Sequence, residues 1–143
     1  MTFEQIRLAI ESRMALWTEA PIAFDGAPTG PAVKTAQNNG TPWVRLTIQS
    51  GDSFTAGIGS QPCVRRTGII MVQIFTARDV GSRPALVLAD SIAAHLEYWQ
   101  SGQLETQAAS VMRVGPTDTY YQINVNCPTV LRACKFTTVA SYT

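Results

Sequence analysis

The sequence predicts one α+β domain, in which a single mixed or mainly antiparallel β-sheet packs with two α-helices. Two segments carry apolar residues at helical spacing, and several others alternate apolar with polar residues as strands do. The length of 143 residues suits a single domain, residues 1–143, with one hydrophobic core. The elements are expected in the order helix, strand, strand, strand, helix, strand, strand.

The first helix is expected to begin at Thr2. Thr2 and Gln5 match a capping box, in which each side chain binds the backbone N–H group of the other residue. Five apolar residues then recur at three- and four-residue steps, as on one face of a four-turn helix: Phe3, Ile6, Ile10, Met14 and Trp17. The helix should end before Pro21, and the residues PIAFDG predict a short strand that ends in an Asp-Gly turn.

Two glycine-rich segments flank the next strand. Residues 26–42 have Gly, Pro and Asn at the density of turns and no apolar periodicity, so a long loop is expected. Residues 42–52 alternate as a strand with one buried face does and should close in a Ser-Gly-Asp turn. Residues 50–61 are expected to form a second loop. Residues 69–75 are apolar on both faces, which predicts a central strand whose second face needs a helix or another subunit to cover it.

The second helix is expected to start after Ser82, because Pro84 is tolerated in a first turn. Its apolar stripe is Ala85, Leu88, Ala89, Ile92, Leu96 and Trp99. Gly102 follows as a stop signal. Residues 110–118 and 119–136 predict two further strands, with Pro128 breaking the ladder or marking an edge.

Composition argues against several classes of function. The chain has 11 Lys and Arg against 10 Asp and Glu, so its overall field is weak and general attraction to nucleic acid is not expected. Charged residues make up 15%, below the roughly 25% of ordinary soluble domains, which favours a surface partly covered by partners. The three cysteines are scattered and His95 is the single histidine, which argues against a zinc site. The cysteines are expected to be free thiols. We expect a soluble protein made in the cytoplasm, without a signal peptide or membrane span.

Catalytic motifs are absent from the sequence. There is no G-x-x-x-x-G-K-[ST], and Gly51, Gly57 and Gly59 precede a strand rather than a helix N-terminus that would hold phosphate. There is no G-x-S-x-G, and His95, beside an apolar helical stripe, is expected to be a packed or surface residue. We therefore expect no enzyme activity, no catalytic residues, no cofactor and no metal.

Paired arginines at the start of a strand are the main candidate for binding. Arg65 and Arg66 could belong to a phosphate or nucleic-acid site, act as a catalytic electrophile, contact another protein subunit, or simply be solvated in a loop. Adjacent strand residues face opposite sides, so the pair cannot enter one groove, which favours contacts with two neighbours. The residues expected at a subunit or tube interface are Arg65, Arg66, Arg45, Arg113, Trp43, Gly57 and Gly59.

Several short segments, taken in order, resemble the tail terminator proteins of long-tailed bacteriophages. They are TFEQIRLAIESRMALW, PIAFDG, PWVRLTI, RRTGIIMVQIFT, the G-S-x-P-A start of the second helix, and YYQINVNCP. The pattern R-R-x-G-x-x-x-V-x-I-F is the most recognisable, and the resemblance spans nearly the whole chain. Members of the family usually end soon after the aromatic-rich last strand, so residues 128–143 are a candidate C-terminal extension with no assigned role.

The resemblance implies a structural virion protein. Such a subunit would form a hexameric ring on the head-proximal end of the tail tube, stop tube polymerisation and meet head-completion proteins. It would be assembled in the host cytoplasm, and its ring would leave room for DNA to pass. Residues 26–42 and 50–62 are candidates for the ring or tube contacts. Two alternatives stay open: a head-completion or neck connector protein, and a small nucleic-acid-binding module.

Overall fold

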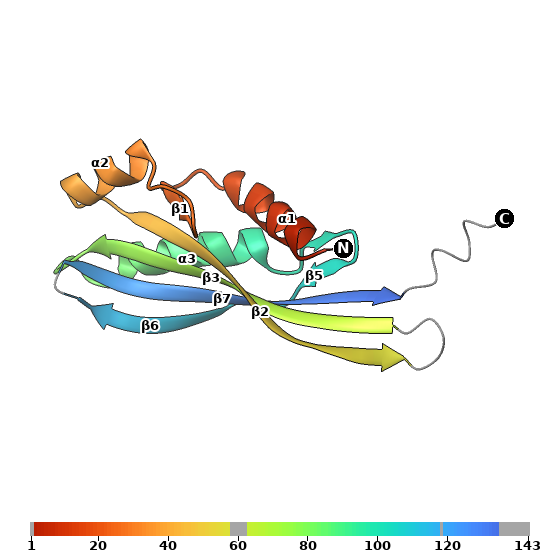
Figure 1. Cartoon of the computed structure of the whole chain (residues 1–143). Coiled ribbons are helices and arrows are strands. Elements are labelled where there is room, and N and C mark those ends of the chain that lie inside the picture. The colour runs from red at the N-terminus through yellow and green to blue at the C-terminus, as the bar shows by residue number, and fades with distance from the viewer. Residues whose placement is uncertain (1, 58–62, 118, 135–143) are drawn as a thin grey trace.

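Three helices and one mixed β-sheet make up the structure, a computed structural model that describes residues 2–57, 63–117 and 119–134 (Figure 1). The elements are α1 Phe3–Ala15, β1 Ile22–Phe24, α2 Pro31–Asn39, β2 Trp43–Gly57, β3 Cys63–Ala77, α3 Arg83–Leu96, β4 Gln100–Ser101, β5 Leu104–Thr106, β6 Ser110–Pro116 and β7 Tyr120–Cys134. The predicted α+β class and single domain are confirmed.

Three long antiparallel strands, β2, β3 and β7, form the centre of the sheet. β1 pairs with β2 in parallel, and β7 pairs first with β6 and then with β5, so that the order is β1-β2-β3-β7-β5-β4 with β6 beside β7. The prediction of a central strand at residues 69–75 is therefore confirmed. Pro128 lies where β7 passes from β6 to β5, and its carbonyl accepts a hydrogen bond from the Gln107 N–H at 2.9 Å.

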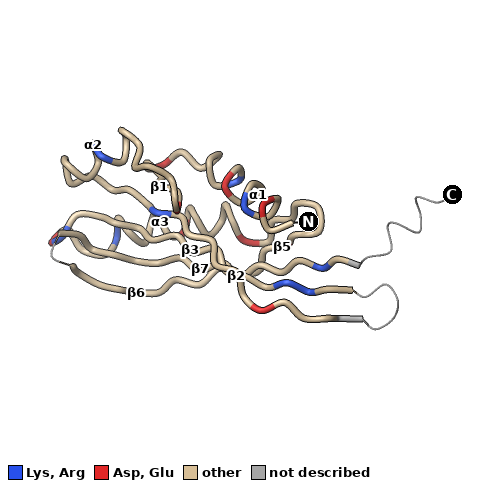
Figure 2. Tube along the Cα trace, in the orientation of Figure 1, with Lys and Arg blue, Asp and Glu red and all other residues tan. Residues whose placement is uncertain are grey.

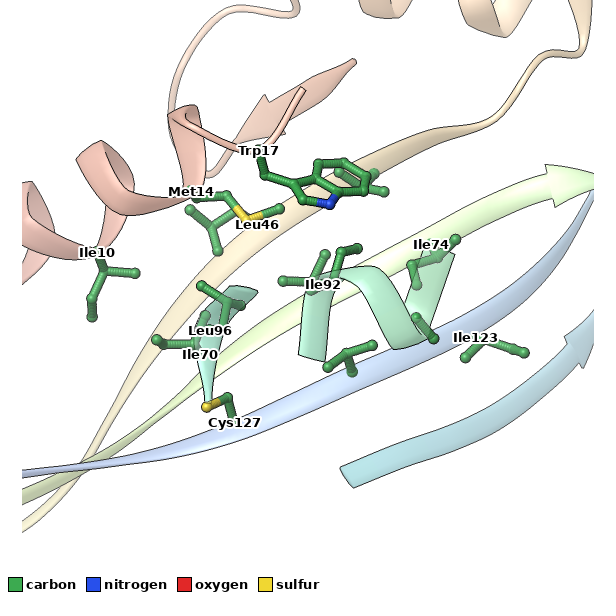
Figure 3. Packing of buried hydrophobic residues seen from close by; sticks show 14 of the residues in the cluster. Ile10, Met14, Trp17, Leu46, Ile70, Ile74, Ile92, Leu96, Ile123 and Cys127 are labelled. Carbon is green, nitrogen blue, oxygen red and sulfur yellow. The ribbon is translucent and has the colours of Figure 1, made fainter. Parts of the chain in front are cut away.

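The main core lies between this sheet and helices α1 and α3 (Figure 3). Alternate residues of the three long strands face the helices and are buried: Val44, Leu46, Ile70, Val72, Ile74, Ile123, Val125 and Cys127. Ile10, Met14 and Trp17 of the first helical segment meet them, as the predicted apolar stripe requires. Each fully buried aliphatic side chain stabilises the fold by about 1.5–3 kcal/mol relative to an exposed one.

Hydrogen bonds hold the two core helices together near their C-terminal ends. The Arg13 guanidinium donates to the His95 carbonyl at 2.9 and 3.1 Å, and His95 Nε2 lies 2.6 Å from the Arg13 carbonyl. The Trp17 indole N–H donates to Ser91 Oγ at 2.9 Å. His95 is thus a packed residue that joins α1 to α3, as one of the two expected roles required.

A helix stands where a long loop was expected at residues 26–42. Pro31 occupies the first turn of α2, and Gly40 ends the helix with a φ of +69°, which glycine adopts without strain. Only Val33 and Ala36 are buried, and they pack against Trp43 on the sheet face away from α1 and α3. Two buried residues give too short a stripe for apolar periodicity to reveal a helix.

The expected Ser-Gly-Asp turn is also wrong, because β2 continues through it to Gly57. The register with β3 shifts between Ser50 and Ser53, so Gly51 and Asp52 form a bulge rather than a turn. A Cβ on Gly51 would lie 2.6 Å from Thr67 Oγ1, so a larger residue would not fit this close approach. Residues 58–62 of the expected second loop lie outside the described residues.

The end of β7 includes part of the expected C-terminal extension. Residues 128–134 pair with β3 and β5, and residues 135–143 lie outside the described part of the chain.

Cys127 is a buried free thiol, as predicted, but Cys63 is disulfide-bonded, so the prediction of free thiols is wrong there. Cys63 stands opposite Cys134 in the register of β3 and β7.

Candidate interaction surfaces

The ends of the three long strands form what we call the arm: residues 50–57 of β2, 63–67 of β3 and 129–134 of β7. Figure 1 shows these strands continuing past helices α1 and α3. No residue of β3 before Ile70 is buried, whereas alternate residues from Ile70 onward are. The arm is therefore a paired sheet with little helical cover. Its β3 side chains are available for contacts, whereas Thr129, Val130 and Leu131 of β7 are buried.

Arg65 and Arg66 point to opposite sides of the arm. The Arg66 guanidinium lies 4.7 Å from the centre of the Phe3 ring, on the side of the helices. The Arg65 guanidinium lies 5.9 Å from the centre of the Phe54 ring, and Phe54 is its direct partner on β2. The expected divergence of the two arginines is confirmed, so they form no common phosphate clamp.

Arg65 stands directly opposite Arg132 of β7, on the side of the arm away from α1 and α3. The two line a hollow of about 450 Å³. Like charges in direct cross-strand pairs repel. Arg132 is paired with Glu105 at 3.0 Å, whereas the buried Arg65 Nε has no hydrogen-bond partner among the described residues. Figure 2 shows basic positions on two strands of the arm and an acidic position on the third. Because Arg65 and Arg132 share the side away from the helices, that side is suited to an acidic group.

Arg45 and Trp43 belong to a different region, at the start of β2. Trp43 is 2% exposed and stacks on Phe75 with ring centres 4.4 Å apart, so its role is structural. The exposed Arg45 guanidinium covers both rings, 5.4 Å from the centre of Trp43 and 5.7 Å from that of Phe75. Along β2, this cluster lies roughly 35 Å from Phe54, so it and the arm form separate surfaces.

The remaining predicted residues are scattered. Arg113 lies on β6 with its guanidinium 5.9 Å from the centre of the Tyr121 ring, on the same side as the helices. Gly57 is the last residue of β2 and pairs with Cys63 at the end of the arm. Gly59 lies outside the described residues. The structure thus brings Arg45 to Trp43 and places Arg65 and Arg66 on opposite sides of one arm, but it makes no single patch.

Sequence reasoning missed two residues of the arm, Phe54 and Arg132. Phe54 is 47% exposed. The sequence feature that could have identified it is an aromatic residue in a stretch of otherwise small and polar residues. Arg132 fell within the expected C-terminal extension, where no role had been considered. Its position opposite Arg65 depends on the strand register, which local sequence does not reveal.

A second surface lies at the other end of the sheet, where α3 begins. We call it the proline hollow: about 600 Å³ lined mainly by apolar residues, including Pro21, Pro42, Pro84 and Val87. Val87 is 52% exposed. Glu19 and Arg83 lie on the lining, and neither forms an ion pair with another described residue. The hollow is thus an apolar concavity flanked by two side chains of opposite charge.

Among the described residues, no three His, Cys, Asp or Glu side chains are grouped as a metal site. Burial raises the pKa of the Cys127 thiol to about 11, which makes it a poor nucleophile at neutral pH. No helix in the portions 2–57, 63–117 and 119–134 is long and apolar enough to cross a membrane.

Comparisons with known proteins agree with this picture. A sequence model of a family described as phage tail terminator protein matches residues 5–125. A solved structure shares the fold with a TM-score of 0.66 and 19% sequence identity, over 92% of this chain and 96% of that one. A search of curated proteins finds no match.

Proposed function

This chain belongs to the phage tail terminator protein family and is a structural protein of a phage tail, and from that membership we propose how it acts. It binds the head-proximal end of the tail tube as a ring, most simply a hexamer. There it stops the addition of tube subunits and offers a surface to the head-completion proteins. The family match over residues 5–125 is the observation that carries the proposal.

The two ends of the molecule support a ring. A ring is built from head-to-tail contacts, so each subunit must offer two different surfaces that fit each other. The arm and the proline hollow differ in shape and chemistry and lie at opposite ends of β3. The separation of the arginines into distant groups also favours several protein contacts over one nucleic-acid groove.

Tube growth in the presence of the protein tests this function. Purified tail-tube subunits are allowed to polymerise with and without the protein, and electron microscopy measures tube lengths. We expect shorter tubes with a ring at one end. Tubes of undiminished length would contradict the proposal.

A second experiment distinguishes a tail terminator from a neck connector protein. Antibodies against the protein should label tails purified from particles that lack heads, because a terminator is added before head joining. Absence from headless tails, with presence on complete virions, would assign the protein to the head instead. A steep fall in DNA affinity with added salt would instead support the nucleic-acid module.

A further inference from the structure

We propose that the arm of one copy docks in the proline hollow of a second copy, with Phe54 as its anchor. The inference rests on the proposed function, since it names the contact between neighbouring subunits of the ring. The family match gives no residues for that contact. The contact is inferred from the shapes of the two surfaces, their charges and their separation along the chain.

Phe54 has the form of an anchor residue. It lies in the uncovered arm with 47% of its surface exposed, and the Arg65 guanidinium covers one side of its ring at 5.9 Å. Aromatic residues and arginine are both enriched at protein interfaces, and arginine is also enriched among the residues that contribute most of the binding energy. The residues of β2 before and after Phe54 are paired with β3, so Phe54 lies in a two-stranded ribbon rather than in a loop.

The proline hollow has the form of the matching socket. Its volume of about 600 Å³ lies in the range of sites that bury an aromatic group with its neighbours. Three prolines line it, from the connections before β1 and β2 and from the first turn of α3: Pro21, Pro42 and Pro84. Proline rings are rigid, so the hollow loses little conformational entropy when it is filled.

Charges on the two surfaces are complementary. The arm carries Arg65, the cross-strand partner of Phe54, and Asp52, two residues before Phe54 on β2, and the hollow carries Glu19 and Arg83. All four lack ion-pair partners among the described residues. Docking would place a base of each copy near an acid of the other. Glu19 would meet Arg65, whose buried Nε has no hydrogen-bond partner within its own chain.

Separation along the strand makes the contact intermolecular. Phe54 pairs with Arg65, and β3 runs a further twelve residues to Ala77 before α3 begins at Arg83. That distance is roughly 40 Å, so Phe54 does not reach the hollow of its own chain. A contact between opposite ends of identical subunits is head-to-tail and forms a ring when the rotation closes.

Photo-cross-linking tests the contact directly. Phe54 is replaced with p-benzoylphenylalanine, and an isotope-labelled and an unlabelled preparation are mixed and irradiated, with and without tail-tube subunits. Mass spectrometry then maps links between differently labelled copies. We expect links to residues 83–88 or 19–21 of the second copy. Thr55, exposed on the other face of the same strand, is the matched control position and should not give these links.

Substitutions give an independent measure by sedimentation. Phe54→Ala and Val87→Asp should each weaken self-association by roughly tenfold or more, as expected for hot-spot residues. Leu16→Ala, at an exposed leucine outside the hollow, should leave it unchanged. Arg65→Glu and Glu19→Arg should each weaken association, and the double variant should recover most of it, provided that circular dichroism shows each variant folded.

The outcomes separate the contact from the function. Links from position 54 only to tube protein, or only to other segments of the second copy, overturn the contact while tube capping can still stand. Absence of any link between copies on capped tubes also overturns it. If the links map to the hollow while tubes grow to full length, the contact is supported and the proposed function fails.

Discussion

The same three strands, β2, β3 and β7, behave differently in the two halves of the molecule. In the half beneath α1 and α3, which we call the body, alternate side chains such as Ile70, Val72 and Ile74 are fully buried. In the arm, the backbone pairing continues, but the described side chains of β2 and β3 stay partly or wholly exposed, and only Thr129, Val130 and Leu131 of β7 are buried. Backbone pairing is therefore common to both halves, and the cover given by helices α1 and α3 accounts for the deeper burial of side chains in the body. We infer that the body stabilises the fold and that the arm serves contacts.

The largest effect should come from a charge in the body. Val72→Asp places an unpaired carboxylate at a position with 0% exposure, in the centre of β3, and should abolish folding at neutral pH. Loss of cooperative thermal unfolding by circular dichroism is the measurement. Thr55→Asp in the arm, at an exposed position of the neighbouring strand, is the control and should change stability by less than about 1 kcal/mol. A Val72→Asp protein that still melts cooperatively would remove the distinction between body and arm.

A moderate effect is expected at Gly68, where the arm joins the body. A Cβ there would lie 3.0 Å from the Gln49 carbonyl oxygen and 3.0 Å from Thr129 Oγ1. Gly68→Ala should lower the free energy of unfolding by about 1–3 kcal/mol, measured by urea denaturation, because the strands must move apart. Combining it with Thr129→Ala removes one of the two close contacts, so the double variant should lose less than the sum of the single losses. Unchanged stability of Gly68→Ala would show that the joint is not tightly packed.

A smaller and pH-dependent effect is expected from Cys127. Burial, the largest cause, raises the pKa of its thiol from 9.0 to about 11. Between those values the unfolded chain has lost the thiol proton and the folded chain still holds it, so the free energy of unfolding should fall as pH rises from 9 to 11. Comparison with Cys127→Ala isolates this residue from other groups that titrate there. Parallel pH profiles for the two proteins would contradict the prediction.

The smallest effect on folding should come from the arm arginines. Arg65→Ala with Arg66→Ala removes two cation–π contacts, with Phe54 and Phe3, and should cost only about 1–2 kcal/mol of stability. Assembly should suffer more, because a partner's desolvated acid would be left unpaired, at a cost on the order of 2–5 kcal/mol. Thermal melting measures the first effect, and ring formation on tube ends measures the second. A double variant that caps tubes normally would show that these arginines are merely solvated.

Local sequence was sufficient to predict most of the helices and long strands. The capping box at Thr2 and Gln5, the stripe of α1 and the alternation of β3 each depend on residues close in the chain. It was insufficient for α2, where two buried residues gave no periodicity, and for the bulge at Gly51 and Asp52, whose sequence is equally typical of a turn. Propensity cannot distinguish such cases, because the partner strand decides whether the backbone continues.

The sequence by itself determined the fold class, the central apolar strand and the opposite directions of Arg65 and Arg66, because all three follow from side-chain period along one segment. Only the tertiary structure decided that Arg132 stands opposite Arg65 and that Trp43 is buried beneath α2. It also decided that prolines from three separate segments meet in one hollow. These features depend on strand register and helix placement, which are set by contacts between residues far apart in the chain.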